Sequence, residues 1–400
     1  MKKKKTKSVV VRNINKPLLI MMFIYLIVGA LMILSASSIS SVLQYGLDSS
    51  FHFFKSQIIY AILGLIGFYV IVHVPTKTYD RFSKLFMAIC VIAILFAFLN
   101  GKIFKEGINT VTLDLGFISF QPAELLKIIM IVYLGVFYDK WCNKTHKKNS
   151  FLIPLFICLI PISFIVLGGD FGSAAIMIAL VALIFFAIPG EEVSFKVLKY
   201  IGIVFFILCI LFLKFAYLVI PEDILESDSR LNRLIYKEPC TRYLSNSGYQ
   251  VCNGYIAISN GNIFSLNIGG STQKYLYLPE SHTDFIFPIV VEELGILLSI
   301  IILVGYAYMI FIILKVSRNS YKLQNSIICY GVAIYFCLHI FINLGGVLGL
   351  LPLTGVPLPF FSYGGSFIIS LIASFGIVQR IHIENLEEKK NREIRKITNS

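Results

Sequence analysis

The chain has 400 residues, of which 57% are hydrophobic and only 14% are charged, and its mean hydropathy is +0.81. This composition excludes a soluble domain of such length and predicts an integral membrane protein. The formal net charge is +13, but the basic residues gather at the chain ends and between apolar runs. No DNA- or RNA-binding motif accompanies them, so no nucleic-acid partner is expected.

Apolar runs of about 17 to 25 residues are typical of membrane-spanning helices. They predict an all-α integral membrane protein with about ten transmembrane helices, in which residues 17–382 form one membrane domain between two tails, 1–16 and 383–400. One large loop, 221–284, separates the seventh span from the eighth. The expected spans are 17–38, 56–74, 84–99, 122–138, 151–167, 173–189, 197–220, 285–314, 325–348 and 364–381.

Lys and Arg residues are concentrated on one side of this topology, in both tails and in every second loop. Because loops rich in Lys and Arg stay in the cytoplasm, the pattern predicts cytoplasmic termini and an external loop 221–284. Cys240 and Cys252 both fall in that loop. An oxidising exterior would allow them to form a disulfide, and the sequence leaves open whether they do.

Ionisable residues gather where the eighth span begins, in residues 278–287. Polar groups are costly at a bilayer boundary, so this cluster indicates a functional site. Asp284 is the candidate catalytic residue, with His282 beside it and Lys274 ten positions earlier.

The fourth span opens with a second candidate, Gln121 followed by Glu124 and Lys127. Glu124 and Lys127 are three residues apart and share one helical face. Either they form an ion pair that only holds helices together, or they line the same cavity as Asp284.

Two further segments are candidates at helix ends. Asp170 stands in a glycine-rich turn and either caps the next helix or faces the site. Residues 349–366, which include Ser362, contain too many prolines and glycines for a regular helix. A broken segment of this kind is tolerated at membrane depth only against protein or a cavity.

Taken in order, these segments resemble the SEDS family of bacterial shape, elongation, division and sporulation proteins, over roughly residues 17–382. The stretch 270–280 is more similar to the FtsW and SpoVE branch, and the stretch 114–122 to the RodA branch; the FtsW-like assignment is favoured. The elements that carry the resemblance are Leu34–Ser38, Gln121–Glu124 with Lys127, Gly169–Gly172, Tyr249-Gln250, Lys274–Phe287 and Pro352–Ser366.

The resemblance implies a ten-helix peptidoglycan glycosyltransferase of the bacterial plasma membrane. Such a protein polymerises lipid II, releases undecaprenyl pyrophosphate and works with a class B penicillin-binding protein. This chain departs from the family at Val111-Thr112, where an Arg-Trp pair is usual.

The chemistry of a lipid-linked sugar assigns roles to these residues. Joining a sugar hydroxyl to an anomeric carbon with inversion needs a base, which Asp284 supplies, and positive charge near the departing pyrophosphate. Lys274 is expected there, with Arg230 and Arg233 as helpers. A divalent cation, Mg or Mn, is a candidate companion of the pyrophosphate, and no organic cofactor is expected. The other expected substrate-binding residues are Glu124, Lys127, Gln121, His282, Asp170 and Ser362.

Two other functions remain open from the sequence. A flippase for a lipid-linked precursor would also have many spans and intramembrane ionisable residues. An inactive scaffold for a penicillin-binding protein would fit the departure at Val111-Thr112, whereas Asp284, Glu124 and Lys127 argue for an active enzyme.

Overall fold

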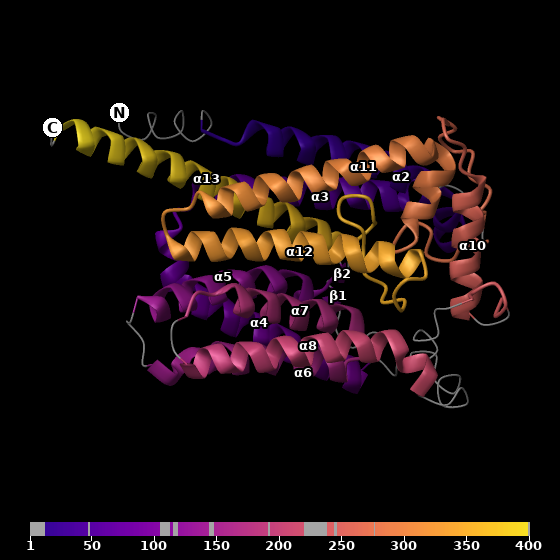
Figure 1. The fold of residues 1–400 in the computed structure, drawn as a ribbon. Coiled ribbons are helices and arrows are strands. Elements are labelled where there is room, and N and C mark those ends of the chain that lie inside the picture. Colours follow the sequence, from indigo (N-terminus) through magenta and orange to yellow (C-terminus); the bar gives the residue numbers. More distant parts are fainter. Residues whose placement is uncertain are drawn as a thin grey trace.

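The computed structural model describes residues 13–46, 49–104, 113–114, 119–143, 148–190, 193–219, 238–243, 246–275 and 277–398. In these residues the chain forms a bundle of long helices (Figure 1) and one antiparallel pair of two-residue strands, β1 (Leu113–Asp114) and β2 (Ser119–Phe120). The helices are α2 (Lys16–Tyr45), α3 (His52–His73), α4 (Lys77–Phe104), α5 (Pro122–Cys142), η2 (Lys148–Leu152), α6 (Ile153–Leu167), α7 (Phe171–Ala187), α8 (Val193–Val219), α10 (Asn246–Asn260), α11 (Ile286–Arg318), α12 (Leu323–Val347) and α13 (Gly365–Thr398).

Each predicted span lies on one of these helices and extends beyond it by at most two residues, except that span 151–167 covers η2 and α6 together. Within the described ranges seven helical stretches are long and apolar enough to cross a membrane. The chain is therefore a multi-pass membrane protein. Two helical features were not predicted. Helix α13 continues well past residue 381, and the large loop contains α10, which lies across one end of the bundle. The first residues of α2 and the last residues of α13 lie at the other end of the bundle, away from α10 (Figure 1).

Local sequence signals set several helix ends. Asn15 precedes α2 and its Oδ1 accepts a hydrogen bond from the N–H of Leu18, at 3.2 Å. Asp170 does the same for α7, where Oδ1 accepts from the N–H of Ser173 at 2.9 Å. Such caps satisfy N–H groups that have no partner inside the helix. The prediction that Asp170 caps the next helix is thus confirmed. Its second carboxylate oxygen has another partner, which is described with the site.

Segment 349–366 is confirmed as a break in the helical pattern, because no regular helix forms between α12 and α13. It is packed against protein: Phe360 is 1% exposed and the Tyr306 hydroxyl donates to the carbonyl of Pro359 at 2.5 Å. Gly29 of α2 allows this packing, since a Cβ there would lie 2.0 Å from the carbonyl oxygen of Phe360. The broken segment is therefore part of the core at the end of the bundle that carries α10.

The structure joins Cys240 to Cys252 in a disulfide, which settles the alternative that the sequence left open. The bond ties the turn before α10 to the middle of that helix. Helix α10 in turn contacts α11, and Gln250 donates to the carbonyl of Pro279 at 3.3 Å. The cross-linked segment thus rests on the turn that leads to Asp284.

Candidate functional site

Asp284 occupies the end of a tight turn directly before α11. The turn closes through hydrogen bonds from the N–H groups of Thr283 and Phe285 to the carbonyl of Glu280, at 3.1 and 3.2 Å. Ser281 anchors it to α2 by donating to the carbonyl of Ala36 at 3.2 Å. Asp284 is half-buried and lies directly before the N-cap of α11, Phe285. The sequence position therefore places a carboxylate at a fixed point on the rim of the bundle.

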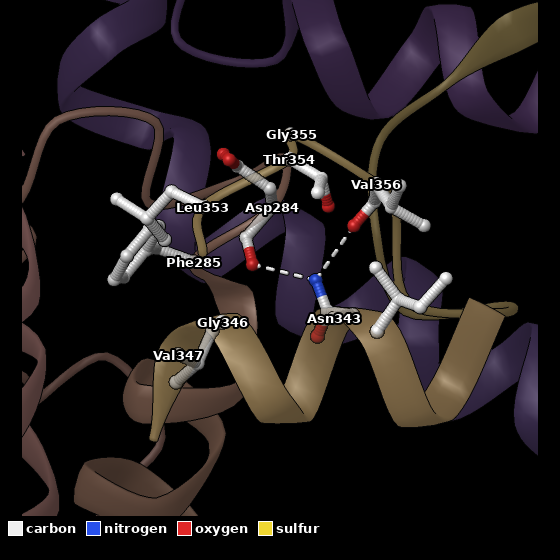
Figure 2. Close-up of a pocket in the computed structure, with 10 residues that line it drawn as sticks. Asp284, Phe285, Asn343, Gly346, Val347, Leu353, Thr354, Gly355 and Val356 are labelled. Atoms are coloured by element: carbon white, nitrogen blue, oxygen red, sulfur yellow. Dashed lines mark hydrogen bonds between the residues drawn. The ribbon is translucent and has the colours of Figure 1, made fainter. Parts of the chain in front are cut away.

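A small pocket of about 170 Å³ opens beside Asp284. Its walls come from the turn before α11 and, about sixty residues later in the sequence, from the end of α12 and the broken segment that follows it (Figure 2). Asn343 and Thr354 contribute polar groups, whereas Leu353 and Val347 make the wall apolar. This mixture of polar groups and apolar walls suits the edge of a sugar ring.

Two neighbours of Asp284 carry polar contacts to the same turn. The Thr283 hydroxyl lies 2.7 Å from Oε2 of the exposed Glu280 and 3.2 Å from Oδ1 of Asp284. Asn343 donates its amide N–H groups to the main-chain carbonyls of Asp284 and Val356, both at 2.8 Å. The Thr283 hydroxyl thus contacts the carboxylate of Asp284, and Asn343 holds the main chain of Asp284 against the pocket wall.

His282 faces aromatic rings and not the pocket. Its ring centroid lies 4.5 Å from that of Phe53 and 6.0 Å from that of Tyr363, and its carbonyl accepts from the N–H of Tyr363 at 2.8 Å. Burial lowers the pKa of His282 below its usual value, and the nearby Glu280 carboxylate opposes this shift. The ring is therefore neutral at pH 7, in a position beside the site.

Lys274 forms a buried ion pair with Glu293 of α11, with 3.0 Å between Nζ and Oε1. Lys274 is 4% exposed and Glu293 is fully buried. The same ammonium donates to the Ser35 hydroxyl at 3.0 Å and to the carbonyl of Gly269 at 2.6 Å. An ammonium has three N–H donors, so all three are occupied, and Lys274 is not among the residues that line the Asp284 pocket.

The adjacent Glu292 holds the same loop. It accepts hydrogen bonds from the side chains of Asn260, at 3.0 Å, and Thr272, at 2.9 Å, and from the Ser271 hydroxyl. Together the two glutamates fasten the loop before Asp284 to α11. This explains why two carboxylates interrupt an otherwise apolar run.

Glu124 and Lys127 form the predicted pair in α5, with 2.7 Å between Nζ and Oε1, and both are buried. The second oxygen of Glu124 has no hydrogen-bond partner. Tyr335 and His339 of α12 are also fully buried, with an unpartnered hydroxyl and an unpartnered Nε2. The pair thus lies in a polar part of the bundle core, and it does not line the pocket at Asp284.

Gln121 and Asp170, predicted from separate segments, lie together. The Gln121 amide donates to Oδ2 of Asp170 at 2.8 Å, and the main-chain N–H of Gln121 donates to the Ser366 hydroxyl at 2.8 Å. The group is next to the pocket wall, because a Cβ on Gly172 would lie 2.4 Å from the carbonyl oxygen of Thr354. These contacts join α5, α7 and α13 behind the broken segment.

Ser362 has a local structural contact. Its hydroxyl accepts from the N–H of Leu358 at 2.7 Å, and it is fully buried. The other predicted residues, Arg230 and Arg233, lie outside the described residues, as does the departure at Val111-Thr112.

No group of three or more His, Cys, Asp or Glu side chains in the described ranges could hold a metal ion. The donor set near Asp284 therefore does not fit a cation bound by these residues alone.

Sequence reasoning missed Asn343, Thr354 and the paired glutamates. Glu292 and Glu293 were visible as adjacent carboxylates in an apolar run, and a buried charge requires a partner. Asn343 was visible as a polar residue four positions after His339 on one face of an apolar helix. No sequence signal distinguished Thr354.

The chain is similar to known proteins along most of its length. A family model for FtsW, RodA and SpoVE, described as cell cycle protein, matches residues 16–387. The probable peptidoglycan glycosyltransferase FtsW of Bacillus subtilis (strain 168) is 36% identical over 375 residues, which are 91% of this chain and 90% of that protein. The stage V sporulation protein E of the same organism is 30% identical over 365 residues, with 91% and 95% covered.

Solved structures show the same fold at low sequence identity. A chain from work titled "Structural coordination of polymerization and crosslinking by a peptidoglycan synthase complex" aligns with a TM-score of 0.69 and 19% identity, covering 93% of this chain and 98% of that one. The rod shape determining protein RodA of Thermus thermophilus aligns with a TM-score of 0.62 and 18% identity, covering 92% and 96%.

Proposed function

Because the chain belongs to the family of FtsW, RodA and SpoVE cell cycle proteins, we propose that it is a peptidoglycan glycosyltransferase that polymerises lipid II into glycan strands. A relative that is 36% identical over 91% of this chain is named as a probable enzyme of this kind. The observation that carries the proposal is the position of Asp284, a half-buried carboxylate at a helix N-terminus beside a pocket with apolar and polar walls.

In this mechanism Asp284 accepts the proton of the attacking sugar hydroxyl. The oxygen then bonds to the anomeric carbon of the second lipid-linked sugar, and the bond from that carbon to the pyrophosphate oxygen breaks, with inversion. Undecaprenyl pyrophosphate leaves with the electron pair. The pocket beside Asp284 orients the sugar edge, which supplies the near-attack geometry that catalysis needs.

Positive charge for the leaving group has to come from residues that are free to move. Lys274 stays the first candidate, although its ammonium must leave Glu293 and Ser35 to reach a pyrophosphate. Arg230 and Arg233 stay candidates from the sequence. A Mg or Mn ion near Asp284 would need substrate oxygens among its ligands, and no step of this mechanism depends on one.

We place the protein in the bacterial plasma membrane with ten crossings, both termini cytoplasmic, and the Asp284 pocket on the external side, where lipid II is used. Loop 221–284 is external in this topology, in agreement with the disulfide of Cys240 and Cys252. The proposed partner is a class B penicillin-binding protein, which would cross-link the strands. A structural neighbour from a peptidoglycan synthase complex supports a partnership of this kind.

The test is polymer formation from purified lipid II by the detergent-solubilised protein, with and without the penicillin-binding protein. Glycan strands that grow with time would support the polymerase. Folded protein that makes no strands under either condition, yet moves labelled lipid II across the bilayer of sealed vesicles, would replace this proposal with the flippase.

A further inference from the structure

The pocket contains a buried side chain that the proposed reaction does not use. Asn343 is 4% exposed and lies near the end of α12. Its Nδ2 donates to the main-chain carbonyls of Asp284 and Val356, both at 2.8 Å (Figure 2). One amide group thus holds two segments that are about seventy residues apart in sequence.

The carbonyl of Asp284 needs this donor because of its place before α11. The N-cap of α11 is Phe285, one residue later. The first intrahelical hydrogen bond goes to the carbonyl of the N-cap, so no N–H of the helix is available to the carbonyl of Asp284. A carbonyl that is removed from water and left without a partner is unfavourable, and Asn343 supplies the bond.

The carbonyl of Val356 has a similar need. It belongs to the broken segment, where no helix or sheet provides donors. Because both carbonyls share one amide, the main chain at Asp284 is set at a fixed distance from the opposite wall of the pocket.

We propose that Asn343 is a positioning residue, which fixes the main chain of Asp284 against the broken segment so that the carboxylate stays on the rim of the pocket. This inference rests on the proposed function, in which Asp284 is the base. Asn343 acts through Asp284 and touches no reacting atom. Its loss should therefore slow the chemical step and leave substrate affinity nearly unchanged.

His339 provides a matched control in the same helix. It lies one turn before Asn343, is fully buried, and its Nδ1 is 3.3 Å from the carbonyl of Pro357. A carbonyl only accepts, so Nδ1 is the donor. His339 thus holds the broken segment at the next carbonyl. Within the described part of the chain it contacts Pro357, Tyr335 and Phe367 and not Asp284.

The experiment compares Asn343→Leu with His339→Phe in the full-length protein. Phe keeps the ring that stacks on Phe367. Initial rates of polymerisation are measured against lipid II concentration for wild type and both variants. We expect Asn343→Leu to lower kcat by roughly 10- to 100-fold with KM changed by less than about twofold, and His339→Phe to keep most of its kcat.

Hydrogen exchange provides a readout that does not depend on activity. Asn343→Leu should speed exchange in residues 284–290 and in 351–364, whereas His339→Phe should speed it only in 351–364. Unchanged exchange at 284–290 in Asn343→Leu, or an equal loss of kcat in both variants, would overturn the proposal. Should Asn343→Leu fail to fold, Asn343→Ser replaces it under the same criteria. A wild type without polymerase activity would refute the proposed function, and the exchange data would still decide whether Asn343 holds Asp284.

Discussion

At the scale of single residues, a buried ion pair holds the loop that leads to the candidate base. Lys274 and Glu293 are both nearly inaccessible, and their partners are Ser35, Ser271 and the carbonyl of Gly269. Removing one member of such a pair leaves a buried charge without compensation.

Lys274→Met should therefore destabilise the folded protein by about 3–5 kcal/mol. The additional change Glu293→Gln removes the stranded charge, so the double variant should recover most of the lost stability. Thermal unfolding of the detergent-solubilised proteins measures the stability of the single and the double variant against wild type. A Lys274→Met variant as stable as wild type would contradict the buried pair.

His282 gives a prediction for pH. Its pKa is lowered in the folded protein because burial favours the neutral ring. The unfolded chain therefore takes up a proton first, and the stability that His282 contributes is complete above about pH 6.5 and declines as the pH falls through the lower folded-state pKa. Wild type should lose more of its melting temperature than His282→Asn between about pH 7.5 and about pH 5. Parallel declines would show that His282 does not titrate in this way.

At the scale of elements, the contact between α2 and the broken segment depends on a residue without a side chain. A Cβ on Gly29 would fall 2.0 Å from the carbonyl oxygen of Phe360, and backbone cannot move aside as a flexible side chain can. The segment that forms one wall of the Asp284 pocket is thus positioned by α2 from behind.

Gly29→Ala should cost about 1–3 kcal/mol through this overlap. The control is Gly67→Ala in α3, where a Cβ would meet nothing within 4 Å, and there the better helix propensity of Ala should leave stability equal or slightly higher. Melting temperatures of the two variants decide the matter. Equal effects at both positions would mean that α2 does not press on the broken segment.

At the scale of the whole molecule, the sequence predicted the helices well because lipid requires long apolar runs, which are visible without knowing their neighbours. The broken segment was also predictable, since prolines and glycines cannot form a regular helix there. Contacts between segments far apart in the chain were not predictable from the sequence. Nothing in the sequence pairs Lys274 with Glu293 before the loop folds back on α11. The role of Asn343 likewise arises only once the turn at Asp284 lies next to the broken segment.

The topology is a prediction at the same scale. A fusion of alkaline phosphatase, which is active only outside the cytoplasm, should be inactive after residue 400 and active after Gly270, because the basic tails stay inside. A fluorescent protein that folds only in the cytoplasm should give the opposite pattern. Activity of the phosphatase at the C-terminus would reverse the proposed orientation and place the pocket on the wrong side for lipid II.

The central claim is that Asp284 is the base of a lipid II polymerase, and one assay tests it most directly. Glu280 is a matched control, because its carboxylate lies in the same turn, shares the Thr283 hydroxyl and is exposed. In polymerisation of purified lipid II with the penicillin-binding protein present, Asp284→Asn should lose at least about a hundredfold of the wild-type rate, and Glu280→Gln should keep most of it, with both variants folded. Strand formation by Asp284→Asn at the wild-type rate would contradict the account.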